Sequence, residues 1–138
     1  MSQKNMCACW LALRRGWLKM KSTKDLINKR MSPKMYALRC KAMSFIYEAK
    51  KLYPSLPRLS VVIVENDKDI LGKARLNKNI IWITERATVS KAVVYHEILH
   101  AVFGLKHVEG CPLMAAGIDD NLSKDLCDLL FVKYTKGA

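Results

Sequence analysis

Apolar residues between positions 33 and 52 recur at intervals of three and four, which predicts an amphipathic helix. Ser32 can cap this helix, Pro33 suits its first turn, and Pro54 ends it. The residues expected on its buried face are Met35, Leu38, Ala42, Phe45, Ala49 and Leu52.

A series of short strands is expected after this helix. The β-branched run at residues 59–65 predicts a buried strand. Residues 72–76 and 79–84 predict two more strands, joined by Asn77 and Lys78 in a hairpin.

Two further helices are predicted in the second half of the chain. Residues 87–104 are expected to form a helix that Thr88 caps and Gly104 ends. Residues 121–134 have the pattern of a final amphipathic helix. This order of elements predicts one α+β domain over residues 32–138, with a small mixed β-sheet packed on the first two helices.

Residues 1–31 are interpreted as a separate basic amphipathic arm. Apolar residues again recur at helical spacing, with Arg14, Arg15 and Lys19 between them. The apolar residues are Met6, Trp10, Leu13, Trp17 and Met20. We expect this arm to dock on its own or a neighbouring chain, with a partner or a membrane surface as alternatives.

The net charge of +12 is concentrated near the N-terminus. Residues 1–58 carry fourteen Lys or Arg and two acidic residues, whereas the remainder carries ten of each sign. This excess fits a nucleic acid, an anionic surface, an acidic partner or a larger assembly. A solvated basic face is the alternative, because no aromatic-interleaved binding module is recognisable beside the charge.

The cysteines and the apolar segments predict a cytoplasmic protein. Five cysteines at irregular spacing, without a C-x-x-C pair, indicate reduced thiols. No apolar stretch approaches the about 20 residues of a membrane span. Arg14 and Arg15 follow the first apolar run, where a signal peptide would have small residues. Incorporation into a virion is the alternative, since the small size and the compact H-E-x-x-H core at residues 96–100 suggest a phage protein.

The segment HEILHAVFGLKH, residues 96–107, contains all three histidines of the chain. His96 and His100 are four residues apart on a predicted helix, so their imidazoles lie on one face and can hold a single ion. Imidazole nitrogen binds zinc, and we expect one Zn²⁺ per chain. Glu97 lies too far round the helix to ligate easily and is expected to act as general base on a zinc-bound water.

A catalytic zinc needs a third protein ligand and an open position. His107 is the first candidate. A continuous helix would carry it about 10 Å beyond His100, but Gly104 lets the chain fold back toward the metal. Cys111 is either a fourth ligand or a small buried residue. The acidic residues that could serve as third ligand instead are Glu109, Asp119, Asp120 and Asp125.

Residues 96–107 resemble the zinc-binding pattern of the metzincin clan of metallopeptidases, H-E-x-x-H-x-x-G-x-x-H. The sequence CPLM at 111–114 resembles the Met-turn of that clan, with Met114 seven residues after His107. The chain departs from the pattern by one additional residue between His100 and Gly104. The resemblance covers residues 32–134 loosely and leaves residues 1–31 outside.

The resemblance implies a zinc peptidase with ligands His96, His100 and His107, in which Glu97 moves the proton. It also implies an extended polypeptide substrate that pairs with an edge strand. Here the strand would contain Lys73, Ala74 and Arg75. The alternative is a zinc-binding structural or assembly component, for example of a virion, that keeps the peptidase fold. A DNA-associated protease is a third interpretation, based on the basic half of the chain.

Overall fold

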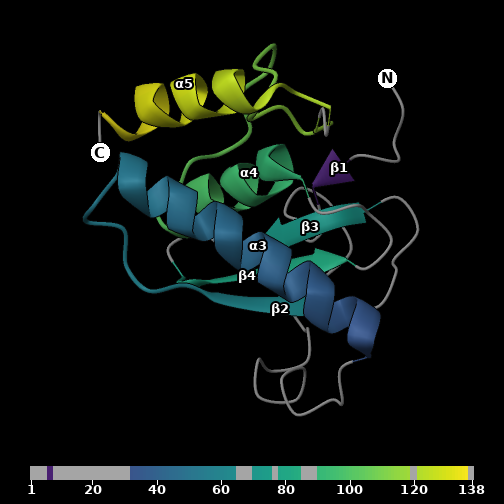
Figure 1. Cartoon of the computed structure of the whole chain (residues 1–138). Coiled ribbons are helices and arrows are strands. Elements are labelled where there is room, and N and C mark those ends of the chain that lie inside the picture. Colours follow the sequence, from purple (N-terminus) through teal and green to yellow (C-terminus); the bar gives the residue numbers. More distant parts are fainter. Residues whose placement is uncertain are drawn as a thin grey trace.

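The computed structural model describes residues 6–7, 32–64, 70–75, 78–84, 90–118 and 121–136 of the 138-residue chain. Within these ranges the protein has the predicted α+β class, with three helices and a small mixed β-sheet (Figure 1). No helix in the described part of the chain is long and apolar enough to cross a membrane.

Helix α3 (Pro33–Leu52) has the bounds that the sequence predicts. The side-chain oxygen of Ser32 accepts a hydrogen bond from the backbone N–H of Met35 at 3.2 Å, which satisfies a donor of the first turn. The buried residues are Met35, Ala42, Phe45, Ile46 and Ala49. The expectation for Leu52 was wrong: it is 37% exposed, because the last turn of α3 extends beyond the sheet (Figure 1).

Three strands follow α3. β2 (Ser60–Val64) is parallel to β4 (Ile80–Thr84), and β3 (Ile70–Ala74) is antiparallel to β4. The predicted hairpin is confirmed, and its turn is closed by the N–H of Lys78, which donates to the carbonyl of Arg75 at 3.3 Å. The strand expected at 72–76 begins and ends two residues earlier, because Arg75 already belongs to this turn.

A short strand near the N-terminus adds to this sheet. β1 (Met6–Cys7) is parallel to β3, so the strand order is β1-β3-β4-β2. The helix predicted for the arm included Met6, and this part of the prediction was wrong. The edge of β3 offers backbone hydrogen bonds to an extended segment whatever the helical spacing of its apolar residues. The other residues of the arm lie outside the described ranges.

Helix α4 (Lys91–Ala101) is buried on every side. It is shorter than the predicted helix at 87–104, and its cap is Ser90 rather than Thr88. The hydroxyl of Ser90 accepts a hydrogen bond from the N–H of Val93 at 3.2 Å. Thr88 lies outside the described residues. A helix buried all round is the centre of its domain.

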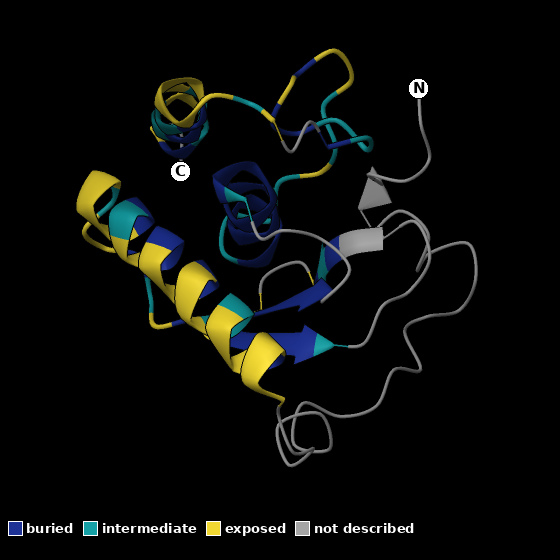
Figure 2. Cartoon of the chain, turned by 45° about the vertical axis from the view of Figure 1, so that its right-hand side comes forward, coloured by how far each residue is buried: buried dark blue, intermediate teal, exposed yellow. Residues whose placement is uncertain are grey.

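The helices form layers over one face of the sheet. α3 packs on β2, α4 lies beside α3 over β3 and β4, and α5 (Lys124–Thr135) packs against α4 (Figure 1). Figure 2 shows that α3 turns its buried side toward the sheet and α4 and its exposed side away from them. The core joins side chains of every layer, such as Phe45, Ile83, Leu99 and Phe131.

A buried lysine connects the three helices. The Nζ of Lys91, whose residue is 5% exposed, lies 2.9 Å from Asp128 of α5 and 3.3 Å from Glu48 of α3. The hydroxyl of Tyr95 donates to the same Asp128 carboxylate at 3.0 Å. Burial opposes the charge on Lys91, but the two carboxylates outweigh it and raise its pKa. Burial, together with the hydrogen bond to Asp128, raises the pKa of Tyr95.

We expect the stabilising contribution of this network to be lost at alkaline pH. The ordinary pKa values are 10.5 for Lys91 and 10.0 for Tyr95, and folding raises both. Above about pH 10 the folded state therefore binds more protons than the unfolded state, so the free energy of unfolding falls as pH rises. Urea denaturation at a series of pH values measures this loss.

The Asp128→Asn variant tests the origin of the effect. It should lower the free energy of unfolding by about 1–3 kcal/mol at neutral pH and flatten its alkaline decline. Glu109→Gln removes an exposed carboxylate outside the network and serves as the control. An unchanged alkaline decline in Asp128→Asn would contradict this account.

Candidate metal centre

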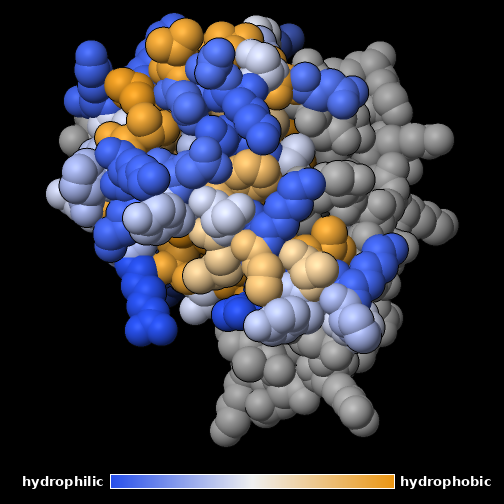
Figure 3. Space-filling model, in the orientation of Figure 1, coloured by the Kyte–Doolittle hydropathy of each residue, from blue (hydrophilic) through white to orange (hydrophobic). Residues whose placement is uncertain are grey.

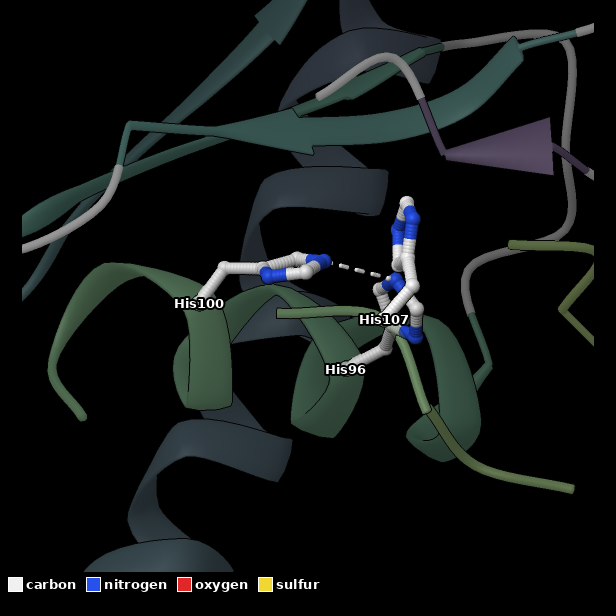
Figure 4. A group of neighbouring side chains, drawn as sticks. All are labelled: His96, His100 and His107. Atoms are coloured by element: carbon white, nitrogen blue, oxygen red, sulfur yellow. Dashed lines mark hydrogen bonds between the residues drawn. The ribbon is translucent and has the colours of Figure 1, made fainter. Parts of the chain in front are cut away.

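His96 and His100 project from one face of α4, as the four-residue spacing predicts (Figure 4). Their Nε2 atoms are 3.0 Å apart, and the rings meet edge to face with centroids 4.6 Å apart. Both residues are almost completely buried. The helix thus brings two imidazole nitrogens together inside the protein.

His107 joins this pair because the chain reverses after α4. Gly104 has a φ of 65°, in the region that glycine adopts most readily. Its N–H donates to the carbonyl of His100 at 3.2 Å, and the N–H of Leu105 donates to the carbonyl of Leu99 at 3.0 Å. These bonds close a wide last turn, which accommodates the additional residue. The predicted reversal at Gly104 is confirmed.

The three histidines form one potential ligand group. Ligand atoms of His96, His100 and His107 all lie within 4.8 Å of one another. The Nε2 of His107 is buried and has no hydrogen-bond partner among the described residues, an arrangement that costs about 1–3 kcal/mol unless a ligand satisfies it. Glu109 and Asp125 are exposed and outside this group. The remaining acidic candidates, Asp119 and Asp120, lie outside the described ranges.

Backbone carbonyls hold the Nδ1 atoms of two of these rings. The Nδ1 of His96 lies 2.6 Å from the carbonyl oxygen of Leu113, and that of His100 lies 2.5 Å from the carbonyl oxygen of Leu105. A carbonyl oxygen can only accept, so each Nδ1 carries the proton and each neutral ring keeps a lone pair at Nε2. Two lone pairs that face each other at 3.0 Å repel unless a positive charge lies between them. Carbonyls that orient histidines in this way are typical of metal ligands.

A proton is a poor source of that positive charge. Burial, and next the neighbouring His100, lowers the pKa of His96 well below its ordinary value. Burial also lowers the pKa of His100, and burial with the nearby His100 lowers that of His107 to about 4. At neutral pH the three rings are therefore neutral, which is the form that binds metals.

The donor set fits zinc. Zinc holds imidazole nitrogens at about 2.0–2.1 Å in tetrahedral geometry, which separates two of them by roughly 3.3 Å. The 3.0 Å between His96 and His100 is close to this value. Three protein ligands leave one tetrahedral position for water or substrate, as in catalytic zinc sites.

Glu97 is fully buried on the side of α4 that faces β3. A Cβ at Gly72 of β3 would lie 3.0 Å from the Oε2 of Glu97 and 3.2 Å from the carbonyl oxygen of Trp82. The absence of a side chain at Gly72 therefore makes room for the carboxylate. Glu97 could be identified from the sequence pattern. Gly72 was not singled out there, although a glycine inside a predicted strand signals a close approach.

The segment that resembles a Met-turn forms a compact turn. The N–H of Ala115 donates to the carbonyl of Cys111 at 2.9 Å, and Met114 between them is fully buried. The carbonyl of Leu113, in the same turn, bonds His96. This support has no sequence signal, because any residue could provide the carbonyl.

Cys111 lies in the core and not in the ligand group. Its sulfur accepts a hydrogen bond from the N–H of Met114 at 3.4 Å. Its hydrogen bond with Tyr134, together with burial, raises the pKa of the Tyr134 hydroxyl to about 12. The small buried residue is therefore the interpretation that the contacts favour.

The resemblance implies that the substrate strand is an edge strand, and this part of the expectation was wrong. β3 has β4 on one side and β1 on the other, in the order β1-β3-β4-β2. Cys7 of β1 lies opposite Gly72, the residue that packs on Glu97. Lys73 and Ala74 lie in β3, and Arg75 follows it and is exposed. Substrate binding by Lys73, Ala74 and Arg75 stays a prediction.

Comparisons with protein-family models, curated proteins and solved structures gave no match for this chain. The likeness to metzincins is therefore a resemblance of motif and element order. A function has to be argued from the site itself.

The contact between Gly72 and Glu97 can be tested without an activity assay. Gly72→Ala should lower the free energy of unfolding by about 1–3 kcal/mol, because the new methyl group meets the carboxylate. In a Glu97→Ala background the same substitution should cost less, since both close contacts with the Glu97 side chain are gone and only the one with Trp82 remains. Urea denaturation of the four proteins gives the coupling energy. Equal costs in both backgrounds would place the clash on Trp82 instead.

Proposed function

We propose that the protein is a zinc-dependent peptidase with a minimal metzincin-like fold. The observation that carries the proposal is the convergence of three neutral imidazoles whose ligand atoms lie within 4.8 Å of one another inside the protein. Glu97, adjacent to the first of them, is buried against β3. A site that only stabilised the fold would need the histidines but not this carboxylate.

The order of elements also supports a metzincin-like fold. A mixed sheet precedes the helix that carries His96 and His100. A glycine turn then leads to His107, and a buried methionine turn and a final helix follow. These features occur in the order that the resemblance implies.

Each group of the site has a role in the proposed reaction. His96, His100 and His107 hold the zinc ion through their imidazoles, and two of them are oriented by backbone carbonyls. A zinc ion held there would supply Lewis-acid chemistry, which would polarise a substrate carbonyl and lower the pKa of a bound water to near neutral. Glu97 accepts a proton at its carboxylate and delivers it to the leaving amine. With β1 displaced, β3 would align an extended polypeptide by strand addition.

A zinc-binding assembly component is the second candidate function. It is favoured by β1, which pairs with β3 directly opposite Gly72 and so occupies the strand that a substrate would use. In this case the zinc would stabilise the fold and no peptide would be cut.

Metal content and cleavage distinguish the two candidates. We expect about one zinc per chain in the wild type and in Glu97→Gln, and cleavage of casein by the wild type alone. Removal of a general base should lower the rate by about 10²–10⁴-fold. Elemental analysis and casein digestion are the measurements, and His107→Ala should reduce zinc affinity.

Glu97→Gln replaces one carboxylate oxygen with an amide group and keeps the shape of the side chain, so it is the matched control for folding. Equal cleavage by both would mean a contaminating protease or a wrong base. Zinc in both without cleavage would favour the assembly component. Absence of zinc from both would reject the metal site.

Removal of β1 should increase cleavage if substrate pairs with β3. A variant without residues 1–9 frees that edge, whereas in the full chain β1 competes as a tethered strand at millimolar effective concentration. We expect a rise of about tenfold in kcat/KM on an extended peptide, and inhibition when a peptide of residues 1–9 is added back. Unchanged kcat/KM with normal zinc content would show that substrate does not use this edge.

A further inference from the structure

The exposed side of α3 has a composition that the zinc site does not explain. Tyr36, Cys40, Met43 and Tyr47 follow each other at intervals of four, three and four residues, which places them in one stripe. Tyr36 is 59% exposed and Tyr47 is 64% exposed. Tyrosines exposed to this extent contribute little to the core, and two of them lie about 16 Å apart along the helix axis.

Cations flank these tyrosines. We call Tyr36, Arg39, Cys40, Met43, Tyr47, Lys50 and Lys51 together the α3 face. The Nε of Arg39 donates to the carbonyl of Val61 at 3.3 Å, which anchors the arginine on β2 and leaves its terminal nitrogens for a ligand. The Nζ of Lys51 lies 4.7 Å from the ring centre of Tyr47, so a positive charge and an aromatic ring are presented together.

The α3 face contains no acidic residue. The one carboxylate of α3 belongs to Glu48, which lies off the stripe and pairs with Lys91 at 3.3 Å. Lys34 and Lys41, both exposed, extend the positive charge along one flank. Figure 3 shows this side of the molecule, where strongly hydrophilic and weakly hydrophobic residues lie side by side along α3.

The cations and the tyrosine rings of the α3 face together indicate the class of ligand. Cations alone suit any polyanion, but exposed aromatic rings among them suit unpaired bases, which stack on aromatic side chains while phosphates meet the cations. A base-paired duplex buries its base faces and cannot use the tyrosines in this way. An amphipathic helix on a membrane inserts a broad apolar face. On α3 the large apolar residues Met35, Phe45 and Ile46 are turned into the core, and Met43 and Leu52 are only 37% exposed.

We propose that the α3 face binds single-stranded nucleic acid without strong sequence preference, through base stacking on Tyr36 and Tyr47 and phosphate contacts to Arg39, Lys50 and Lys51. This function is separate from peptide hydrolysis, because the face lies on the side of α3 that points away from α4 and its histidines (Figure 2). It does not depend on zinc.

Fluorescence anisotropy of the full-length protein with a labelled oligothymidylate tests the proposal. A length of about 20 nucleotides exceeds the roughly 4–16 that single domains of this kind cover. Tyr36→Ala/Tyr47→Ala should weaken binding about tenfold or more, whereas Tyr36→Phe/Tyr47→Phe should bind like the wild type. Lys50→Gln/Lys51→Gln should reduce the slope of log K against log salt by about 1.4, for two lost phosphate contacts.

Lys106→Gln/Lys133→Gln is the matched control, because it removes the same charge at exposed positions outside α3. It should leave the affinity within about twofold of the wild type. Circular dichroism checks that each variant is folded.

Four results would overturn the proposal. The first is that the wild type does not bind the oligonucleotide, and the second is that it binds a duplex of the same length equally well. The third is that the tyrosine-to-alanine variant binds as tightly as the wild type. The fourth is that Lys50→Gln/Lys51→Gln and Lys106→Gln/Lys133→Gln lose the same affinity. If vesicles with anionic lipid bind in place of the oligonucleotide, the face is a membrane surface and the proposal is wrong. Tight single-strand binding that none of the α3 variants changes would assign it to another part of the chain.

Discussion

The Nε2 atoms of His96 and His100 face each other at 3.0 Å in the interior of the protein, and this contact constrains most of what surrounds it. Both nitrogens carry lone pairs, since the Nδ1–H of each ring donates a hydrogen bond to the carbonyl of Leu113 or Leu105. A cation between the rings would remove the repulsion between these lone pairs. The two carbonyls belong to segments that follow α4, so the fold of the loop and the orientation of the ligands depend on each other.

Helix α4 carries several polar groups into the core, and each is compensated by a different element. Lys91 is matched by carboxylates from α3 and α5, and the histidines are held by the loop between α4 and α5. Glu97 fits under β3 because Gly72 has no side chain. Burial of uncompensated charges would cost several kcal/mol, so α4 can occupy its central place only when all of its neighbours are assembled. Assembly of the histidine cluster and folding of the domain are therefore closely coupled.

The two sides of α3 have different surroundings, because one is buried in the core and the other is exposed. Its inner side contributes Phe45 and Ile46 to the core that supports α4. Its outer side contributes little to the core, and exposed tyrosines lie there among cations. The division explains how a small domain could combine a zinc site with a second binding surface, because the helix that separates them packs through one face only. Part of the positive charge of residues 1–58 thus lies on the α3 face.

Helix geometry is local, and for this reason much of the metal centre could be predicted from residues close in sequence. The spacing of His96 and His100 determines that their rings meet, and Gly104 provides the backbone conformation that brings His107 to them. The helix caps at Ser32 and the β3–β4 hairpin follow from equally local patterns. A pattern of this kind predicts which way a side chain points from its own helix or strand. It does not predict which distant group will lie opposite that side chain.

That limit explains what only the tertiary structure decided. The carbonyls of Leu113 and Leu105 have no sequence signature, and the role of Gly72 requires β3 to lie over Glu97. The extended pairing of Met6–Cys7 with β3 prevailed over a helical pattern because an open strand edge supplies hydrogen bonds to any short segment. The exposure of Tyr36 and Tyr47 likewise depends on which side of α3 meets the sheet. The sequence by itself determined which residues can bind a metal, and the packing of distant elements decided their tautomers, their burial and the surfaces left free.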